Sequence, residues 1–265
     1  MSANLTKETV TITQKQDDPF SVGDWLYWMC EYGKARECFQ AILKQPSVSN
    51  SDMARCYKSM GAVEVELKNY DEALNIYNKY LDILAKCDST NREQDIMSCY
   101  VSIGKIYWLK HDYDKAIAYH HQALKFALPF IPPTSRISAV HNNLASIYTK
   151  TKQFDLALEH FQRALEIDLQ YLREDHLQFG QTYANMGTMY QSKQNYEKAL
   201  EYFEKARETW LRSLSSTHPA TKKIENTICN VKSKLGKRQN CSEDNFYRNL
   251  GDASREVFSI ACLVV

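Results

Sequence analysis

Three histidines are the first residues of this chain whose type and spacing could do chemistry. His120 and His121 are adjacent, and His160 lies further along the chain. Imidazole nitrogens bind zinc, but a zinc site needs three or four ligands, usually in closely spaced pairs, and no carboxylate or thiolate partners stand at such spacing here. We therefore interpret His120 as a core residue and His121 and His160 as residues of an outer helix face. We expect no metal site and no cofactor.

Two glutamates, Glu64 and Glu66, have the spacing of the paired glutamates of arginine ADP-ribosyltransferases. Here the pair lies within a helical pattern, and the Arg and Ser motifs of those enzymes are missing around it. An isolated short motif outside its structural context is weak evidence for an activity. We interpret the pair as part of a repeated helix and predict that the chain has no catalytic residue.

Eight cysteines are scattered along the chain without a C-x-x-C pair. A disulfide framework is typical of small secreted chains. The polar N-terminus lacks the apolar core of a signal peptide, and no stretch approaches the ~18 apolar residues of a membrane span. We therefore expect a cytoplasmic protein with reduced, mostly buried thiols.

The last four residues, from Cys262 to Val265, have the Cys-aliphatic-aliphatic-X form of a prenylation site. Val is not a typical last residue, and no polybasic run adjoins the motif. The alternative is an apolar helix end that packs on the rest of the fold. Cys262 is thus a candidate lipidation site, and we expect it to carry no lipid.

The elements that must position any site recur along the chain. Five segments share a small residue, an aromatic residue nine positions later, an Ala three further on and an aromatic or His four beyond that. The small residues are Gly23, Gly61, Gly104, Ala145 and Gly187, the first aromatics are Tyr32, Tyr70, Tyr113, Phe154 and Tyr196, the alanines are Ala35, Ala73, Ala116, Ala157 and Ala199, and the last residues are Phe39, Tyr77, His120, Phe161 and Phe203.

Each copy is typical of a pair of antiparallel helices. Apolar residues of the first helix recur at i, i+3, i+4 and i+7, as in Tyr183, Met186, Gly187 and Tyr190, which is one face of an α-helix. The small residue lets the second helix approach closely. One such hairpin cannot bury its apolar face alone, so the copies must stack. The pattern predicts an all-α solenoid of about five hairpins with a capping helix and no β-sheet.

These residues resemble the tetratricopeptide repeat (TPR) family, whose motif has this order of small, aromatic and Ala positions. Successive small residues stand 38, 43, 41 and 42 positions apart, against 34 in the common TPR. The chain is similar in this to the long repeats of kinesin light chains and nephrocystin-3-like proteins, and His176 and His218 stand where those proteins carry a His-containing joint. The resemblance implies a right-handed superhelix. Ile42 and Tyr80 depart from the motif, as does the irregular joint 126–133.

The expected organisation is a disordered segment over residues 1–19, a solenoid over 20–236 and a tail over 237–265 whose apolar spacing is compatible with a helix. A solenoid end needs a helix with a polar outer face, which the last repeat segment supplies. The expected repeats cover approximately residues 16–50, 54–87, 97–130, 138–171 and 180–213, with the cap at 219–236.

The face of the first helices opposite the core is the expected binding groove. Side-chain amides offer both donors and an acceptor to a peptide backbone, and Asn143 and Asn185 occupy the place of a groove asparagine in related long TPRs. Any solvated helix face is polar, and this plainer interpretation stays open. The candidate groove residues are Asn143, Asn185, Lys105, Lys150, Arg55, Ser102, Gln181 and Thr188.

Two functional hypotheses follow. The first is a monomeric, non-catalytic adaptor or scaffold that binds an extended peptide or partner segment in the groove. The second is the TPR portion of a larger enzyme, such as an ADP-ribosyltransferase joined to TPRs. The net charge of +1 provides no overall field to attract nucleic acid or an anionic membrane.

Overall fold

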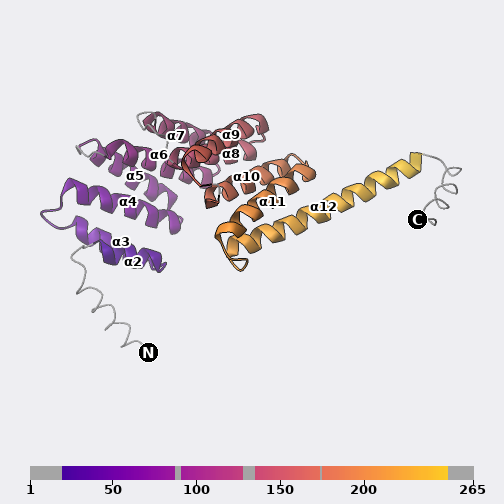
Figure 1. Cartoon of the computed structure of the whole chain (residues 1–265). Helices are drawn as coiled ribbons and strands as arrows, with labels where there is room; N and C mark the ends of the chain where they lie inside the picture. The colour runs from indigo at the N-terminus through magenta and orange to yellow at the C-terminus, as the bar shows by residue number, and fades with distance from the viewer. Residues whose placement is uncertain (1–19, 87–90, 128–134, 174, 250–265) are drawn as a thin grey trace, which may run out of the picture. The chain divides into compact units, whose positions relative to one another are not determined.

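The computed structural model describes residues 20–86, 91–127, 135–173 and 175–249, with side chains up to residue 236. Within these ranges the chain forms eleven α-helices and no strand, which confirms the all-α prediction (Figure 1). The helices are α2 Ser21–Trp28, α3 Tyr32–Leu43, α4 Asn50–Glu66, α5 Tyr70–Leu84, α6 Arg92–Leu109, α7 Tyr113–Ala127, α8 Ser135–Lys150, α9 Phe154–Tyr171, α10 Leu177–Ser192, α11 Tyr196–Ser213 and α12 Pro219–Asn249.

The chain divides into two compact units, residues 1–133 and 134–265. The first contains the hairpins α2/α3, α4/α5 and α6/α7. The second contains α8/α9 and α10/α11, with α12 packed against α11. The expected N-terminal segment 1–19, most of the joint 126–133 and Cys262 lie outside the described residues.

The same turn joins the two helices of every hairpin. One residue in each turn has the left-handed conformation, with φ between 60° and 62°. The following amide then donates to a carbonyl five residues earlier, as Asn195 does to Tyr190 at 2.9 Å, which is the 6→1 bond of a common helix C-terminal motif. The repeated turn fixes the antiparallel geometry of the hairpins. The left-handed residues are Cys30, Lys68, His111, Lys152 and Gln194.

In the four copies whose small residue is Gly, this glycine lies directly against the aromatic or His that ends the motif. A Cβ atom added to Gly61 would stand 2.7 Å from Cζ of Tyr77, and one added to Gly187 would stand 2.6 Å from Cδ1 of Phe203. Contacts this short are overpacked, so the helices reach this separation only because the side chain is missing. The prediction that the small residue permits close approach is confirmed.

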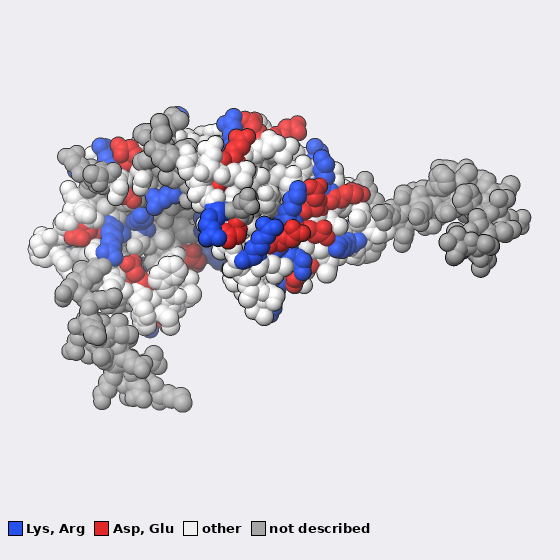
Figure 2. Space-filling view, in the orientation of Figure 1, with Lys and Arg blue, Asp and Glu red and all other residues white. Residues whose placement is uncertain are grey.

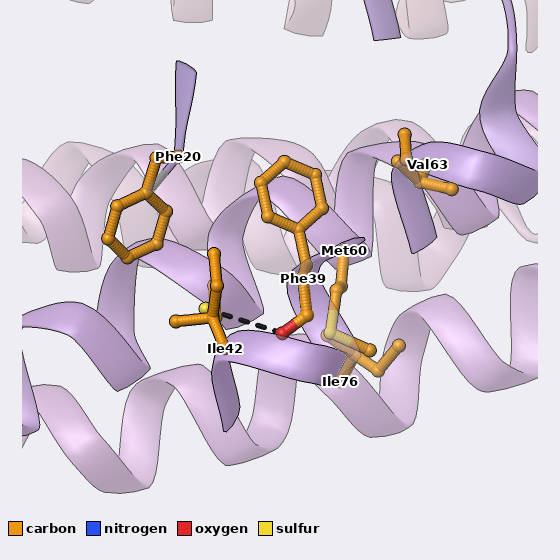
Figure 3. Close-up of a cluster of buried hydrophobic side chains, with 8 residues drawn as sticks. Phe20, Phe39, Ile42, Met60, Val63 and Ile76 are labelled. Atoms are coloured by element: carbon orange, nitrogen blue, oxygen red, sulfur yellow. Dashed lines mark hydrogen bonds between the residues drawn. The ribbon is translucent and has the colours of Figure 1, made fainter. Parts of the chain in front are cut away.

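Consecutive hairpins share apolar clusters. In the first, Phe20, Phe39 and Ile42 pack with Met60 and Val63 of the next hairpin (Figure 3). Ile42 and also Tyr80, which depart from the motif, are both buried and simply enlarge the clusters.

The thiols divide between core and surface. The Cys56 thiol donates to the Phe39 carbonyl at 3.7 Å, and burial raises the pKa of Cys56 to about 11 and that of Cys99 to about 12. Cys30 and Cys229 are exposed. The expectation of mostly buried thiols therefore fails for the described cysteines, because turn and cap positions also carry them.

The assignment of His160 to an outer face is wrong. Its side chain is buried and its Nδ1 lies 2.8 Å from Nδ1 of His141. The ring also stacks on Tyr148, 5.4 Å between centroids. His160 therefore belongs to the interface of α8 and α9. His120 is buried as expected, and His121 is exposed.

The cap helix is longer than the predicted 219–236, because α12 continues without a break to Asn249. Its first half packs on α11 through Ile224, Ile228 and Val231, all buried. Glu225 of α12 forms an ion pair with Arg207 of α11, with 3.2 Å between Oε1 and Nε.

Charges of both signs are interspersed on the face shown in Figure 2, and no field of one sign is present there. None of the described helices combines the length and the apolar composition needed to cross a bilayer.

Gly61→Ala should lower the free energy of unfolding of the first unit by ~1–3 kcal/mol, because the new methyl group overlaps the Tyr77 ring. Gly33→Ala is the matched control, since a Cβ at Gly33 meets nothing within 4 Å. Urea denaturation followed by circular dichroism checks both. Equal stability of Gly61→Ala and the wild type would refute the close-packing account.

His120 predicts a pH dependence of stability. Burial lowers its pKa from 6.5 to about 4, so below pH 6.5 the unfolded chain binds a proton that the folded chain excludes. The free energy of unfolding should therefore fall as the pH drops from 6.5 to 4, by on the order of 3 kcal/mol.

In His120→Phe this fall should be absent, whereas His121→Phe, at an exposed neighbour, should keep it. His120→Phe should also be more stable at neutral pH, because the buried Nδ1 of His120 has no partner among the described residues. Denaturation at several pH values measures both effects. An unchanged pH slope in His120→Phe would contradict the assignment.

Candidate peptide-binding groove

One face of α10 is apolar and buried, and the other carries short polar side chains. Gln181, Asn185 and Thr188 follow one another at spacings of four and three residues, so they lie along one side of the helix. The opposite side buries Phe179 and Met186. The same division on α8 leaves Asn143 half-buried between fully buried neighbours. Because the apolar side of each helix is buried in the core, the polar residues of the repeat lie on the opposite side.

A cavity of about 550 Å³ lies where α8, α10 and the start of α12 meet within the second unit. Asn143, Gln181 and Asn185, which sequence analysis selected, are all in its wall. Among the described residues no Asp, Glu, Lys or Arg lines it, so the cavity is suited to neutral groups. Its lining residues are Ala139, Asn142, Asn143, His176, Leu177, Gln178, Gln181, Asn185, Trp210, Leu214, His218 and Ala220.

A second cavity of about 270 Å³ continues the first along α10. Gln181, Asn185, Trp210 and Ala220 line both. Thr188 joins the wall here. The two cavities together form a groove along the polar side of α10, and we call it the α10 groove.

The side-chain amides of the wall differ in how many hydrogen bonds they already make within the protein. Asn185 Oδ1 accepts from Gln181 Nε2 at 3.0 Å, which leaves the Asn185 amide donors for a ligand. Asn142 donates to Thr182 at 2.7 Å and is buried, so it supports the wall. The Asn143 side chain makes no hydrogen bond to another side chain or to the backbone among the described residues. Its donors and acceptor are available to a bound chain.

Trp210, which is largely buried, is an aromatic residue of the groove wall. A Cβ at Gly180 would overlap the indole Nε1, so Gly180 makes the room in which the ring lies. The indole N–H donates to the Leu177 carbonyl at 3.2 Å. This bond fixes the ring orientation, and the ring lines both cavities.

A buried carboxyl group lies behind the wall. Asp168 is fully buried, and its Oδ1 accepts from Gln178 Nε2 at 3.2 Å. The same Gln178 amide nitrogen donates to Ser138 Oγ at 3.0 Å. Burial raises the pKa of Asp168, against the lowering effects of Ser138, His176 and Gln178. The network holds Gln178 in place as part of the wall.

His176 and His218, the histidines between repeats, cap the helices that follow them. His176 Nδ1 accepts a hydrogen bond from the backbone N–H of Gln178, and His218 Nδ1 accepts one from the backbone N–H of Ala220, both at 3.2 Å. Each ring thus satisfies an orphan amide at the start of a helix, and each lines the larger cavity.

The other candidate residues do not join this groove. Lys150 is exposed at the last turn of α8 and is not part of the cavity wall. Arg55, Ser102 and Lys105 belong to the first unit. Arg55 pairs with Asp24 at 3.1 Å and covers the Phe20 ring at 4.2 Å from its centroid, so its guanidinium is already engaged.

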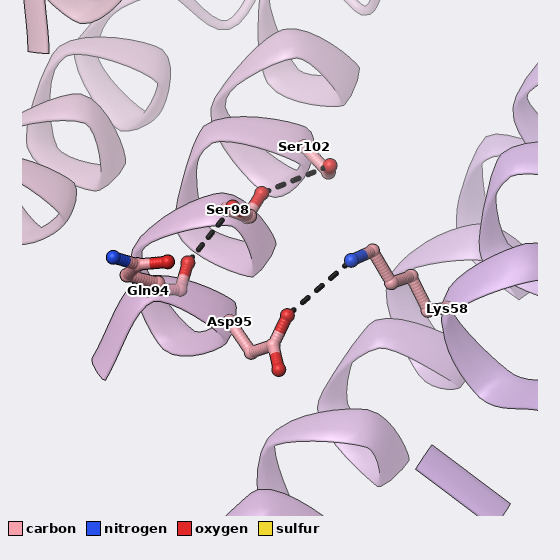
Figure 4. A network of polar contacts seen from close by, with 5 residues as sticks. All are labelled: Lys58, Gln94, Asp95, Ser98 and Ser102. Carbon is pink, nitrogen blue, oxygen red and sulfur yellow. Dashed lines mark hydrogen bonds and ion pairs between the residues drawn. The ribbon is translucent and has the colours of Figure 1, made fainter. Parts of the chain in front are cut away.

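On α6 the polar side is a ladder of internal hydrogen bonds (Figure 4). Ser102 donates to the Ser98 carbonyl at 3.0 Å, and Ser98 donates to the Gln94 carbonyl at 2.8 Å. Lys58 of α4 pairs with Asp95 at 3.3 Å. Lys105 is exposed beside them. The hydroxyl groups of Ser98 and Ser102 donate their hydrogens within α6, so they can only accept hydrogen bonds from a ligand.

Sequence reasoning missed Trp210, Leu177, Leu214 and the contribution of α12. The repeat alignment contains a partial signal for Trp210. This residue lies seven positions after Phe203, and the equivalent position in the preceding copy, seven after Phe161, is Asp168. Each of these two positions faces the residue seven before the small residue, Gly180 and Ser138 respectively. The fourth copy has Ser138 and Asp168 at these two positions, whereas the fifth has Gly180 and Trp210 and therefore places an aromatic ring in the groove wall.

The tetratricopeptide repeat profile matches residues 20–86, 136–208 and 178–239, and a second profile of the same description matches residues 98–129. Together the matches span most of the chain.

Among solved structures, BtubC (BKLC) from P. vanneervenii superimposes with a TM-score of 0.65 at 16% identity, covering 83% of this chain and 88% of that one. The nearly identical TPR-like repeats of a putative kinesin light chain from Podosopora anserina give 0.58 at 16% identity, covering 76% and 100%. A signal transduction ATPase with a tetratricopeptide repeat sensor from Pyrococcus horikoshii gives 0.63 at 20% identity, covering 73% and 29%. These likenesses concern the fold.

Asp168→Asn should stabilise the second unit at neutral pH. Because burial raises the carboxyl pKa, the folded chain binds the proton more tightly than the unfolded chain does. The stability contributed by the protonated form is lost as the pH rises through the folded-state pKa. The melting temperature of Asp168→Asn minus that of the wild type should therefore increase with pH. Glu166→Gln, exposed on the same helix, is the control and should show no such trend. A difference that shrinks with rising pH would refute the assignment.

Proposed function

The chain belongs to the tetratricopeptide repeat family, with kinesin light chain-like repeats among its structural relatives, and on this premise we propose that it is a non-catalytic scaffold that binds an extended peptide of a partner protein in the α10 groove. The family generally serves protein–protein interaction. The single observation that carries the finer proposal is the placement of Asn143 and Asn185 in the wall of one cavity.

The two asparagines occupy the same position of successive repeats, two residues before Ala145 and Gly187. An extended backbone presents its N–H and C=O groups at a regular rise along its length. Amides placed on successive first helices match such a chain without reading its side chains, because each amide both donates and accepts. This supports a ligand that is bound mainly through its backbone.

The lining supports a neutral segment at the centre of the groove. A clamp for a terminal carboxylate needs cationic donors, and no Lys or Arg of the described residues lines the larger cavity. Trp210 and Leu177 provide an apolar surface beside the amides. A ligand with an apolar side chain next to a backbone held by Asn143 and Asn185 fits both features.

The test is a selection from a library of random peptides displayed on phage, with the full-length protein as bait. Selected peptides are then synthesised and titrated against the wild type and the double variant Asn143→Ala/Asn185→Ala by calorimetry. Loss of two groove hydrogen bonds, at ~1–3 kcal/mol each, should weaken binding at least tenfold. The melting temperature should stay unchanged, since both side chains lie at the groove surface.

Gln170→Ala provides the matched control, because this amide is exposed on α9 and is not part of the cavity wall. It should bind the peptides as the wild type does. If the double variant and Gln170→Ala bind every selected peptide with equal affinity, the α10 groove is not the peptide site.

A further inference from the structure

Among the described residues the first helix, α2, presents an apolar surface that no described residue covers. Ten large apolar side chains of the described residues are exposed, and four of them lie on or directly after α2. They are Val22 at 36%, Trp25 at 39%, Trp28 at 80% and Met29 at 58% of their full exposure. A patch of this kind on a single short helix indicates an interaction surface.

The repeat register shows that two of these positions are interface positions. Val22 precedes the small residue by one and Trp25 follows it by two. In the other four copies the same two positions are apolar and at most 7% exposed. The equivalents of Val22 are Met60, Ile103, Leu144 and Met186, and those of Trp25 are Val63, Ile106, Ile147 and Met189.

Within the first unit the structure also shows what covers such a face. Phe39 and Ile42 of α3 pack on Met60 and Val63 of α4. In the same way α5 packs on α6, where Tyr77, Tyr80 and Leu84 meet Ile103 and Ile106. The covering element is in both cases the second helix of the preceding hairpin, and it is amphipathic.

The covering helices share one chemistry. Each has a small residue, an aromatic four positions later and an apolar residue three beyond that. In α3 these are Ala35, Phe39 and Ile42, and in α5 they are Ala73, Tyr77 and Tyr80. The stripe of apolar residues faces the next hairpin, and the polar side faces solvent.

We propose that the exposed face of α2 binds an amphipathic helix of a partner protein, seated as α5 is seated on α6. The surface continues the interface that already joins successive hairpins. It also offers no unpaired charge, since Asp24, the one charged residue of α2, pairs with Arg55 at 3.1 Å. The partner helix therefore needs a small–aromatic–apolar stripe at i, i+4 and i+7. This site is separate from the α10 groove, which lies in the second unit.

The probe is a fluorescein-labelled peptide with the sequence of α5, Tyr70–Leu84, because this helix covers the equivalent face of α6. Its binding to the full-length protein is measured by fluorescence anisotropy, beside a scrambled peptide of the same composition. The α5 peptide should bind and the scrambled peptide should bind at least tenfold more weakly. Trp25→Glu should reduce the affinity of the α5 peptide at least tenfold.

Trp108→Glu is the matched control. Trp108 is exposed to 36% on α6, so this variant adds the same charge at an exposed Trp away from α2 and should keep wild-type binding. Val22→Glu should repeat the effect of Trp25→Glu, and circular dichroism should show unchanged helix content in all three. Equal binding of both peptides, or equal binding by Trp25→Glu and the wild type, overturns the proposal.

Two other results would also overturn it by naming a different occupant. If a chain that begins at Phe20 binds the α5 peptide at least tenfold more tightly than the full chain, the protein's own N-terminal residues occupy the face. If light scattering shows a dimer that Trp25→Glu dissociates, a second copy of the chain occupies it.

Discussion

The close approach of two helices at a missing side chain is the constraint on which the rest of the structure depends. A Cβ at Gly23, Gly61 or Gly187 would stand 2.6–2.7 Å from the ring that follows in the second helix. The ring can therefore fill the space between the helices completely. With one side of each first helix committed in this way, only the opposite side remains for solvent or a ligand. The α10 groove lies along that opposite side of α10, whose small residue is Gly187.

Spacing along the chain is sufficient to predict much of this arrangement. The recurrence of Gly, Tyr, Ala and Phe at fixed intervals identifies the hairpins, and helical geometry then places Asn143, Gln181 and Asn185 on the side away from the core. The structure finds these three in one cavity wall. Their placement away from the core could be predicted because it depends on local periodicity, which a single sequence contains, while their role in peptide binding stays a prediction.

The features that sequence reasoning missed depend on contacts between repeats or on single copies. Trp210 lines the groove because Gly180 leaves room for it, and neither residue recurs in another copy. His160 was misplaced because helical projection takes no account of its neighbour on α8, where His141 offers a buried partner at 2.8 Å. The cap helix was expected only to close the core, yet Ala220 lines the groove and Lys223 its smaller cavity. Such contacts follow from three-dimensional packing.

The neutral lining of the groove decides what kind of recognition it supports. Charged clamps give affinity that falls with salt, whereas amide contacts beside an apolar ring depend little on ionic strength. Among the described residues the only lysine in the two cavities lies at the smaller one. The central contacts of a bound segment would thus be hydrogen bonds from Asn143 and Asn185 together with burial against Trp210. Partner choice would then depend on an apolar side chain and an accessible extended backbone.

Hydrogen–deuterium exchange of the full-length protein, with and without a selected peptide, tests this most directly because it locates the ligand without any substitution. The account predicts slower exchange in peptic fragments covering residues 139–143, 177–188 and 219–227, with fragments of α3 and α5 unchanged. Protection confined to helices outside α8, α10 and α12 would contradict it.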